Sequence, residues 1–432
     1  MDNTINFSWI AKCVSDSMLV SQIENPAISK LKKKDAKKVR AISKKLPLKK
    51  ETLSDNENKL VNKFSAPKYG PIFYEIKGVV HYKGLIGETV IIQYVESSKD
   101  SLMLAQELQK IAWARGCHAM RIPLSSKDLK ARYKTAPDNT LFELSKLSLG
   151  LIRSADVSIT VGDEEDPTWS RGLEEKLAYG ARASRERYNA YEKARGRSAL
   201  LSIPIRRKGF VPQKKYFSVF YSSLKETFSK KMINIIDNYE KQFKNKDVIR
   251  ITANDGTDLT FSIKNRILLR DDALAPKKKA GGEHYNFPAG EVFVAPIETS
   301  AEGTIIFDYV TPRGFGLIRD LKMVFKKGKA VEFSAKGDGA KAFKKFLDAN
   351  TGKKDMIGEF GIGCNPGAEF IGTTIVDEKI YGSIHIAIGW NKGPFKGKNE
   401  ASSHQDMIKI LKGKQGNVYA DGKLVIKNGM PV

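Results

Sequence analysis

The chain has 432 residues, of which 41% are hydrophobic and 28% charged, so it is long enough for two or three domains with full cores. No run approaches the roughly 18 apolar residues that span a bilayer, which excludes a membrane-spanning protein. The first twenty residues lack a basic lead and a continuous apolar core, and the three cysteines (Cys13, Cys117 and Cys364) have no paired spacing. We therefore expect a cytoplasmic protein without disulfide bonds.

The net charge of +25 is the unusual feature of the composition. Residues 1–70 hold fifteen basic and seven acidic side chains, a net +8, and the stretch from Lys30 to Lys50 has eleven bases and one acid. The rest of the chain therefore carries about +17. Such a charge favours polyanions such as RNA or the ribosome, although a lysine-rich solvated surface explains it equally well. The basic stretch has no interleaved aromatic residues, so base-specific recognition is not indicated.

Residues 1–70 are predicted to form a basic N-terminal extension, in which Phe7, Ile10, Cys13 and Val14 mark one short amphipathic helix. Residues 71–246 are predicted to form an α/β domain of the doubly wound type, because strands and helices alternate from Glu88 onward. The predicted strands are ETVIIQYV, CHAMRIPL, ADVSITVG and ALLSIPI, and the predicted helices are SLMLAQELQKIAWAR, the polar stretch 169–195 and a helical linker, SLKETFSKKMINIIDNYEKQFKN. The first strand-to-helix turn, YVESSKD, has no GxGxxG, which argues against a dinucleotide site.

Residues 247–432 are predicted to form a second domain that is β-rich, of α+β type. VIRITANDGTDLTFSIK alternates on both sides of an Asn-Asp-Gly turn, which is a strong hairpin signal. Further strand-like runs follow, interrupted by one predicted helix. The strand-like runs are EVFVAPIE, GTIIFDYV, LKMVFKKGKAVEFSA, KIYGSIHIAIG and VYADGKLVIK, and the helix is GDGAKAFKKFLDANTG.

Two of the five histidines of the chain stand in an unusual setting within this second domain. In SIHIAIG the isoleucines occupy one strand face, which leaves His385 on the other face beside alanine and glycine. His404 and Asp406 are two residues apart and share a face of any extended segment. Glu291 and Glu359 stand in apolar, glycine-rich runs, where a buried carboxylate needs a compensating cation. Together these five side chains predict a metal site.

Four blocks of this domain, in this order, resemble the metallo-aminopeptidases of the aminopeptidase T and aminopeptidase S type: NFPAGEVFVAP, IGEFGIGCNP, DEKIYGSIHIAIG and SSHQD. The similarity extends from about Val80 to the C-terminus and is strongest to archaeal sequences of this family catalogued as leucyl aminopeptidases. The resemblance implies a metal-dependent exopeptidase that releases N-terminal residues from peptides. It also implies a homodimer that encloses its active sites, and two divalent ions, commonly zinc or cobalt. The family's ligands fall on Glu291, Glu359, His385, His404 and Asp406.

The ligand set suits two ions about 3.5–4 Å apart, which need several carboxylates, one of them shared. From the sequence it stays open which carboxylate is shared and which acts as general base. Glu359 and Lys392 are the candidate catalytic residues. Lys392 stands where the family has a tyrosine, seven positions after the strand histidine, and a lysine there would donate to an oxyanion only if it reached inward.

Two other functions stay open. The same superfamily resembles, at His385, His404 and Asp406, ring-cleaving dioxygenases that act on dihydroxypyridine with one non-haem iron. Retention of both glutamates favours the dinuclear hydrolase. The third reading is a basic protein that binds RNA or the ribosome and has a reduced or lost peptidase activity.

Overall fold

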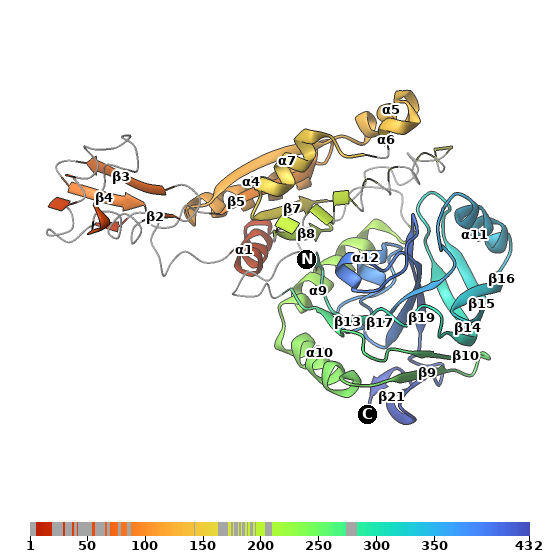
Figure 1. The fold of residues 1–432 in the computed structure, drawn as a ribbon. Helices are drawn as coiled ribbons and strands as arrows, with labels where there is room; N and C mark the ends of the chain where they lie inside the picture. Colours follow the sequence, from red (N-terminus) through yellow and green to blue (C-terminus); the bar gives the residue numbers. More distant parts are fainter. Residues whose placement is uncertain are drawn as a thin grey trace.

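The computed structural model describes residues 6–19, 88–141, 143–162, 196–203, 210–273 and 283–432, with short described pieces between residues 29 and 83 and between 172 and 194 (Figure 1). Most of the predicted helix over residues 169–195 and most of the lysine-rich stretch of residues 30–50 lie outside the described residues. In the described part of the chain, no helix is both long and apolar enough to cross a bilayer.

Five parallel strands form one sheet, in the order β12-β8-β7-β5-β6. Numbered along the chain this order is 2-1-3-4-5, which is an order found in doubly wound folds. The four strands predicted from alternation with helices are all present. Their bounds are β5 Thr89–Val95, β6 His118–Leu124, β7 Val157–Val161 and β8 Arg197–Leu201, and the fifth strand is β12, Glu283–Phe287.

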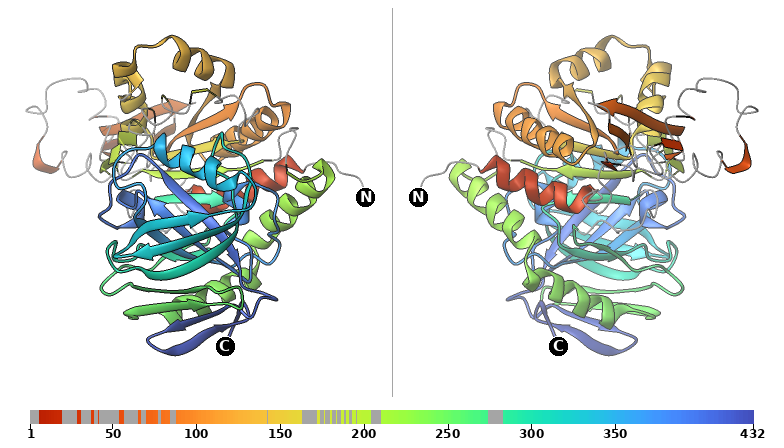
Figure 2. Two further views of the ribbon diagram at one scale, coloured as in Figure 1. Left: turned by 90° about the vertical axis from the view of Figure 1, so that its right-hand side faces the viewer. Right: turned by 90° about the vertical axis from the view of Figure 1, so that its left-hand side faces the viewer.

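Helix α4 (Lys99–Ala114) packs on β5, β6 and β7, and it begins where Ser98 accepts a hydrogen bond from the amide of Ser101. Helix α1 (Phe7–Met18) in turn packs on α4 and contributes Ile10 and Val14 to the core of the α/β domain (Figure 2). The amphipathic helix expected near the N-terminus is therefore present, and it is part of this core. Between β6 and β7 lie the helices α5 Ser126–Thr135, α6 Asp138–Leu141 and α7 Lys146–Ser154.

The helical stretch expected as one linker consists of two helices, α9 (Gln213–Thr227) and α10 (Lys230–Phe243). The break falls at Ser229, whose hydroxyl accepts a hydrogen bond from the amide of Met232 and so starts α10. Side chains of α9 enter the α/β core, whereas those of α10 enter the core of the second domain. Both helices are therefore packed elements that join the two cores.

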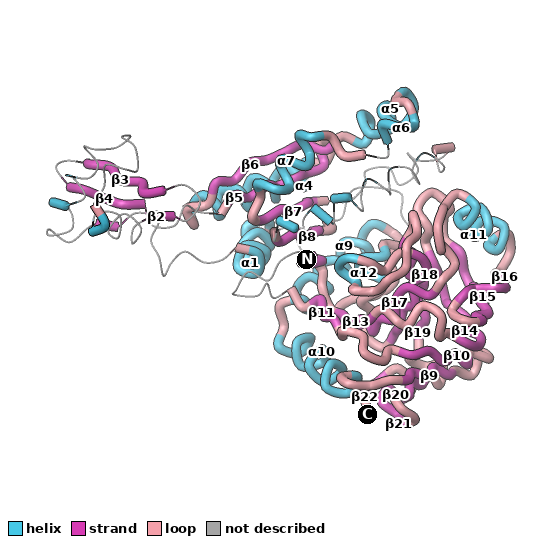
Figure 3. The backbone as a smooth tube through the Cα atoms, in the orientation of Figure 1, coloured by secondary structure: helices cyan, strands magenta, loops and turns pink. Residues whose placement is uncertain are grey.

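In the described residues, thirteen strands form a curled, mostly antiparallel sheet in the C-terminal part of the chain (Figure 3). Its main order is β11-β13-β17-β18-β19-β14-β10-β9-β20-β21-β22, with β15 on β14 and β16 on β15. The expected hairpin at the Asn-Asp-Gly turn is present as β9 and β10, which pair from Asp258 with Thr252 to Ser262 with Val248. Their bounds are β9 Val248–Thr252, β10 Asp258–Ser262, β11 Leu269–Asp271, β13 Glu291–Val294, β14 Glu302–Val310, β15 Ile318–Lys326, β16 Lys329–Ser334, β17 Ile357–Gly363, β18 Ser383–Gly389, β19 His404–Ile410, β20 Asn417–Ala420, β21 Lys423–Lys427 and β22 Met430–Pro431.

Helices cover this sheet on its outer sides. Helix α10 lies against β13, and α11 (Gly339–Asp348) lies against β15 and β16 (Figure 1). The aromatic residues Phe243, Phe261 and Phe360 meet in the core at ring-centroid distances of 5.9 and 5.3 Å. Two short helices, α12 (Thr374–Asp377) and the 3₁₀ turn Gly393–Phe395, stand on either side of β18 in sequence.

Strand β12 lies within the stretch 247–432, yet it pairs in parallel with β8 of the other sheet. The chain thus returns once to the α/β sheet before β13 begins the run of strands that carries the candidate ligands. A second, small antiparallel sheet is formed by β1 Ser29–Lys30, β2 Ser65–Ala66, β3 Gly70–Ile76 and β4 Val79–Lys83.

Candidate metal centre

The five predicted ligands come from four strands that are neighbours in the sheet, β13, β17, β18 and β19. Glu359 pairs with Ala387, which pairs with Asp406, so these three form one row across the sheet. The other ligand positions pair with glycine: Glu291 with Gly363, His385 with Gly361, and His404 with Gly389. Directly paired residues share a face, so all five side chains project from one face of the sheet.

Glycine and alanine separate the ligands, and this leaves room for the imidazoles. A Cβ atom on Gly361 would lie 2.0 Å from Nε2 of His385, so the ring occupies the space above that glycine. Small residues at the paired positions explain why the GEFGIG and HIAIG runs combine glycine with polar groups inside an otherwise apolar sheet.

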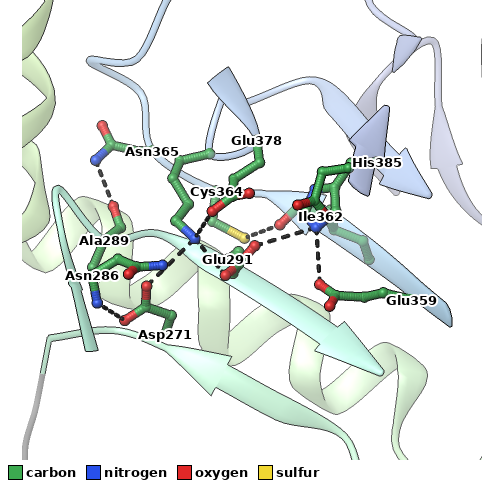
Figure 4. A network of polar contacts seen from close by, with 12 residues as sticks. Asp271, Asn286, Ala289, Glu291, Glu359, Ile362, Cys364, Asn365, Glu378 and His385 are labelled. Atoms are coloured by element: carbon green, nitrogen blue, oxygen red, sulfur yellow. Dashed lines mark hydrogen bonds and ion pairs between the residues drawn. The ribbon is translucent and has the colours of Figure 1, made fainter. Parts of the chain in front are cut away.

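The first group consists of Glu291, Glu359 and His385, all of them buried. Nε2 of His385 donates to Oε1 of Glu359 at 3.1 Å and lies 3.4 Å from Oε2 of Glu291 (Figure 4). One potential ligand atom from each residue lies within 4.8 Å of the other two.

The second group consists of Glu359, His404 and Asp406. Nε2 of His404 lies 3.4 Å from Oε2 of Glu359 and 3.4 Å from Oδ1 of Asp406. Glu359 therefore belongs to both groups and offers a different oxygen to each. The side chains of His404 and Asp406 keep 17% and 11% of their exposure, so the site opens to solvent on their side.

The ring of His404 is fixed from two directions. Its Nδ1 donates to the carbonyl oxygen of Trp390 at 2.6 Å. Nε2 is therefore the nitrogen whose lone pair a metal would bind. The ring of Phe395 stacks on the imidazole, with centroids 4.3 Å apart and planes 16° from parallel. Phe395 in turn contacts Trp390 and Phe293 edge to face.

A divalent metal fits these residues, because buried ligand atoms lack other partners. Oε2 of Glu291 and Oε2 of Glu359 are buried and accept no hydrogen bond within the described structure. Buried carboxylate oxygens are ordinarily satisfied, so two such atoms facing imidazoles mark a place for a cation. The donor set of carboxylate oxygens and imidazole nitrogens suits divalent metals such as zinc.

The proton affinities of the metal-free site point the same way. Burial alone would lower the pKa of His385, but the adjacent carboxylates of Glu359 and Glu291 raise this pKa to about 9. The pKa of His404 is raised well above its ordinary value by Asp406 and Glu359, again against the effect of burial. Burial favours the neutral form of Asp406, yet His404 lowers the pKa of that carboxyl to about 2. The cluster therefore attracts positive charge at both imidazoles.

Three charged residues beside the site were not anticipated from the sequence. Lys379 is fully buried, and its ammonium pairs with Glu291, with Glu378 at 2.7 Å and with Asp271 at 3.5 Å. Figure 4 shows Asp271, Glu291 and Glu378 grouped on the side of the cluster away from Glu359. The available signal was the run VDEKI shortly before the histidine strand, where a lysine follows two acidic residues and precedes an isoleucine.

Lys392 is not brought to the five ligands. Its ammonium pairs with Glu400, and the two side chains are 44% and 66% exposed. The loop that carries it is held from another direction, because Glu298 accepts hydrogen bonds from Asn391 and from the amide of Lys398.

Comparisons with known proteins support the metal centre. A model of the thermophilic metalloprotease (M29) family matches residues 230–423, which include all five predicted ligands. Comparison with curated protein sequences gives no significant match.

Two solved structures share the fold over most of the chain. Wild-type AmpT from Thermus thermophilus is 18% identical with a TM-score of 0.58, covering 80% of this chain and 94% of that one. The 2,5-dihydroxypyridine dioxygenase from Pseudomonas putida is 16% identical with a TM-score of 0.54, covering 80% and 92%. Both likenesses show the combination of a parallel sheet with a curled antiparallel sheet.

The family match covers the blocks on which the sequence resemblance rested, and it confirms that resemblance together with the expected enzyme class, a metal-dependent hydrolase. Residues 230–423 of this chain thus match the M29 family of thermophilic metalloproteases.

Proposed function

We propose that the protein is a metallo-aminopeptidase whose site holds two divalent metal ions, zinc or cobalt by preference. The observation that carries this proposal is the double membership of Glu359, which offers one oxygen to the group of Glu291 and His385 and the other to the group of His404 and Asp406. A shared carboxylate between two sets of ligands is the arrangement that a dinuclear site requires. The fold shared with the AmpT of Thermus thermophilus adds support for aminopeptidase chemistry.

Glu291, Glu359, His385, His404 and Asp406 would hold the two ions, which would lower the pKa of a water molecule and polarise the scissile carbonyl. The protein's own part is to hold the ligands on one rigid sheet face, with burial of Glu291, Glu359 and His385 excluding bulk water. The substrate is expected to enter beside His404 and Asp406, the two ligands that keep some exposure.

The substrates that we propose are peptides with a free N-terminus, because several buried carboxylates surround the site and favour an α-ammonium group. Lys392 has no part in this scheme unless it leaves Glu400. A homodimer, taken from the sequence resemblance, and a cytoplasmic location, taken from the unpaired spacing of the cysteines, are further parts of the proposal. Light scattering of the purified full-length chain tests the homodimer.

Two measurements test the proposal: titration of the metal-free chain with cobalt(II), and then turnover of a leucyl peptide by the loaded protein. We expect two ions per chain and release of leucine. Glu359→Gln should retain the fold by circular dichroism, lose both steps of the titration and bring turnover to background, because it removes the ligand common to both groups. Two ions bound by Glu359→Gln with wild-type affinity and turnover would contradict the proposal.

A mononuclear iron dioxygenase is the second candidate, since a protein of that activity shares the fold. It would use His385, His404 and Asp406. The structure divides these residues between two groups that meet at Glu359, and this arrangement favours the dinuclear hydrolase. One iron per chain together with oxygen-dependent cleavage of 2,5-dihydroxypyridine would decide for the dioxygenase.

A further inference from the structure

The ammonium of Lys379 is enclosed by three carboxylates that come from three separate elements. Asp271 ends β11, Glu291 begins β13, and Glu378 follows α12. The side chain of Lys379 has 0% exposure; its ammonium donates to Glu291 and Glu378 and forms an ion pair with Asp271 at 3.5 Å. Burial alone would favour the neutral amine, so the three carboxylates are what keep Lys379 charged.

Lys379 is held in place by its backbone as well as by its charge. Its carbonyl oxygen accepts the amide of Asn365 at 2.8 Å, and its own amide donates to the carbonyl of Val376 at 3.1 Å. The side-chain amide of Asn365 donates to the carbonyl oxygens of Ser223 and Ala289. The ammonium is therefore fixed relative to α9 and to the start of β13, where Glu291 stands.

The two oxygens of Glu291 have different environments. Oε1 accepts a hydrogen bond from Lys379, whereas Oε2 accepts none and lies 3.4 Å from Nε2 of His385. The ammonium thus fixes the rotation of the carboxylate and leaves one oxygen facing the cluster. A lysine that served only to neutralise buried acids would not need to divide the carboxylate in this way.

We propose that Lys379 is a positioning residue that anchors Oε1 of Glu291 so that Oε2 alone is presented to the metal position of Glu291, Glu359 and His385. This inference rests on the proposed two-ion function. Outer partners that orient a metal ligand change metal affinity by about 10–100-fold when they are removed. The ion pairs of Lys379 are with Asp271, Glu291 and Glu378, so the affinity of the position of Glu359, His404 and Asp406 should depend on this anchor much less.

Cobalt(II) titration of the metal-free full-length chain, followed by calorimetry and by visible absorption, tests the inference. Lys379→Met keeps the apolar stem without the charge. In this variant we expect binding at the position of Glu291, Glu359 and His385 to weaken by about 10–100-fold, so that it becomes the second binding step. The first step should stay within about threefold. With two cobalt ions added per chain, the absorption spectrum of the variant should show one cobalt environment, whereas that of the wild type should show two.

A matched control separates positioning from loss of a buried charge. Lys409 is also fully buried in the same sheet, but it pairs with Asp255 at 2.6 Å and does not contact a candidate ligand. Lys409→Met should lower the unfolding temperature and retain both cobalt steps. Glu378→Gln, which removes another partner of Lys379 and leaves the contact with Glu291, should also retain both steps.

If Lys379→Met does not fold, the double variant Glu378→Gln/Lys379→Met removes one charge of each sign and takes its place. The inference is overturned if the folded variant binds two cobalt ions with wild-type affinities, or if Lys409→Met loses the second step as well. A wild-type chain that binds a single ion overturns the proposed function itself. The two failures are therefore distinguishable.

Discussion

Gly361 and His385 face each other across β17 and β18, and the imidazole occupies the space that a side chain at position 361 would fill. A Cβ atom there would lie 2.0 Å from Nε2 and 2.1 Å from Cε1 of the ring. The residue type at position 361 in β17 therefore decides whether the imidazole of His385, a predicted ligand in β18, has room. A glycine is needed at this position because it is opposite a histidine.

The first prediction concerns this contact. Gly361→Ala should push the ring of His385 away from Glu359 and cost about 1–3 kcal/mol of unfolding free energy, as overpacking of a buried site does. Metal retention at the position of Glu291, Glu359 and His385 should be lost, which metal analysis after dialysis would measure. Gly150→Ala is the control, because a Cβ atom at that position in α7 meets nothing within 4 Å. Equal metal content in the two variants would contradict the prediction.

The second prediction concerns pH in the metal-free protein. The folded-state pKa of His385 is raised to about 9, against about 6.5 in an unfolded chain, so the folded state binds more protons between these values. This contribution to stability is complete below about pH 6.5 and is lost as the pH rises through about 9. The free energy of unfolding should therefore fall across this window, by at most about 1.4 kcal/mol per pH unit for each proton.

Urea unfolding of the metal-free chain at pH 6.5, 7.5 and 9 measures that slope. Cobalt affinity should rise over the same window, because the protons on the imidazoles must leave when a metal binds. His385→Asn should flatten the dependence of stability on pH. A wild-type protein whose metal-free stability is constant from pH 6.5 to 9 would show that the imidazoles do not hold these protons.

The third prediction concerns Lys392, at the position of the family's tyrosine. Its pair with Glu400 is exposed, and pairs of this kind contribute about 0–1 kcal/mol. Lys392→Ala and Glu400→Ala should each change stability by less than about 1 kcal/mol, and kcat on a leucyl peptide should stay within about threefold of the wild type. A loss of kcat by more than about 100-fold in Lys392→Ala alone would show that the ammonium leaves Glu400 and acts on the substrate.

Much of the local structure is legible in the sequence. Alternation in SIHIAIG predicted that His385 shares a face with Ala387 and Gly389, and the pairing of β18 with β17 and β19 confirms it. The Asn-Asp-Gly turn predicted the hairpin of β9 and β10, and the helix predicted between β5 and β6 is present as α4. These features depend on side-chain period and on turn chemistry, which neighbouring residues determine.

Other features depend on which distant segments pair, and no local pattern encodes that. The sequence left open which carboxylate is shared, and only the register of β17 between β13, β18 and β19 puts Glu359 within reach of both imidazoles. Likewise, Lys379 is 88 residues from Glu291 in sequence, and its contact with that carboxylate arises from tertiary packing. The return of β12 to the parallel sheet has the same origin.

The sequence by itself thus determined which residue types are available as ligands and on which strand faces they stand, because period and turn preference act over a few residues. The tertiary structure alone decided how those faces are aligned, which oxygen each carboxylate presents, and where the buried ammonium lies. Strand register and burial result from contacts between segments tens of residues apart, whose free energies no short stretch of sequence contains.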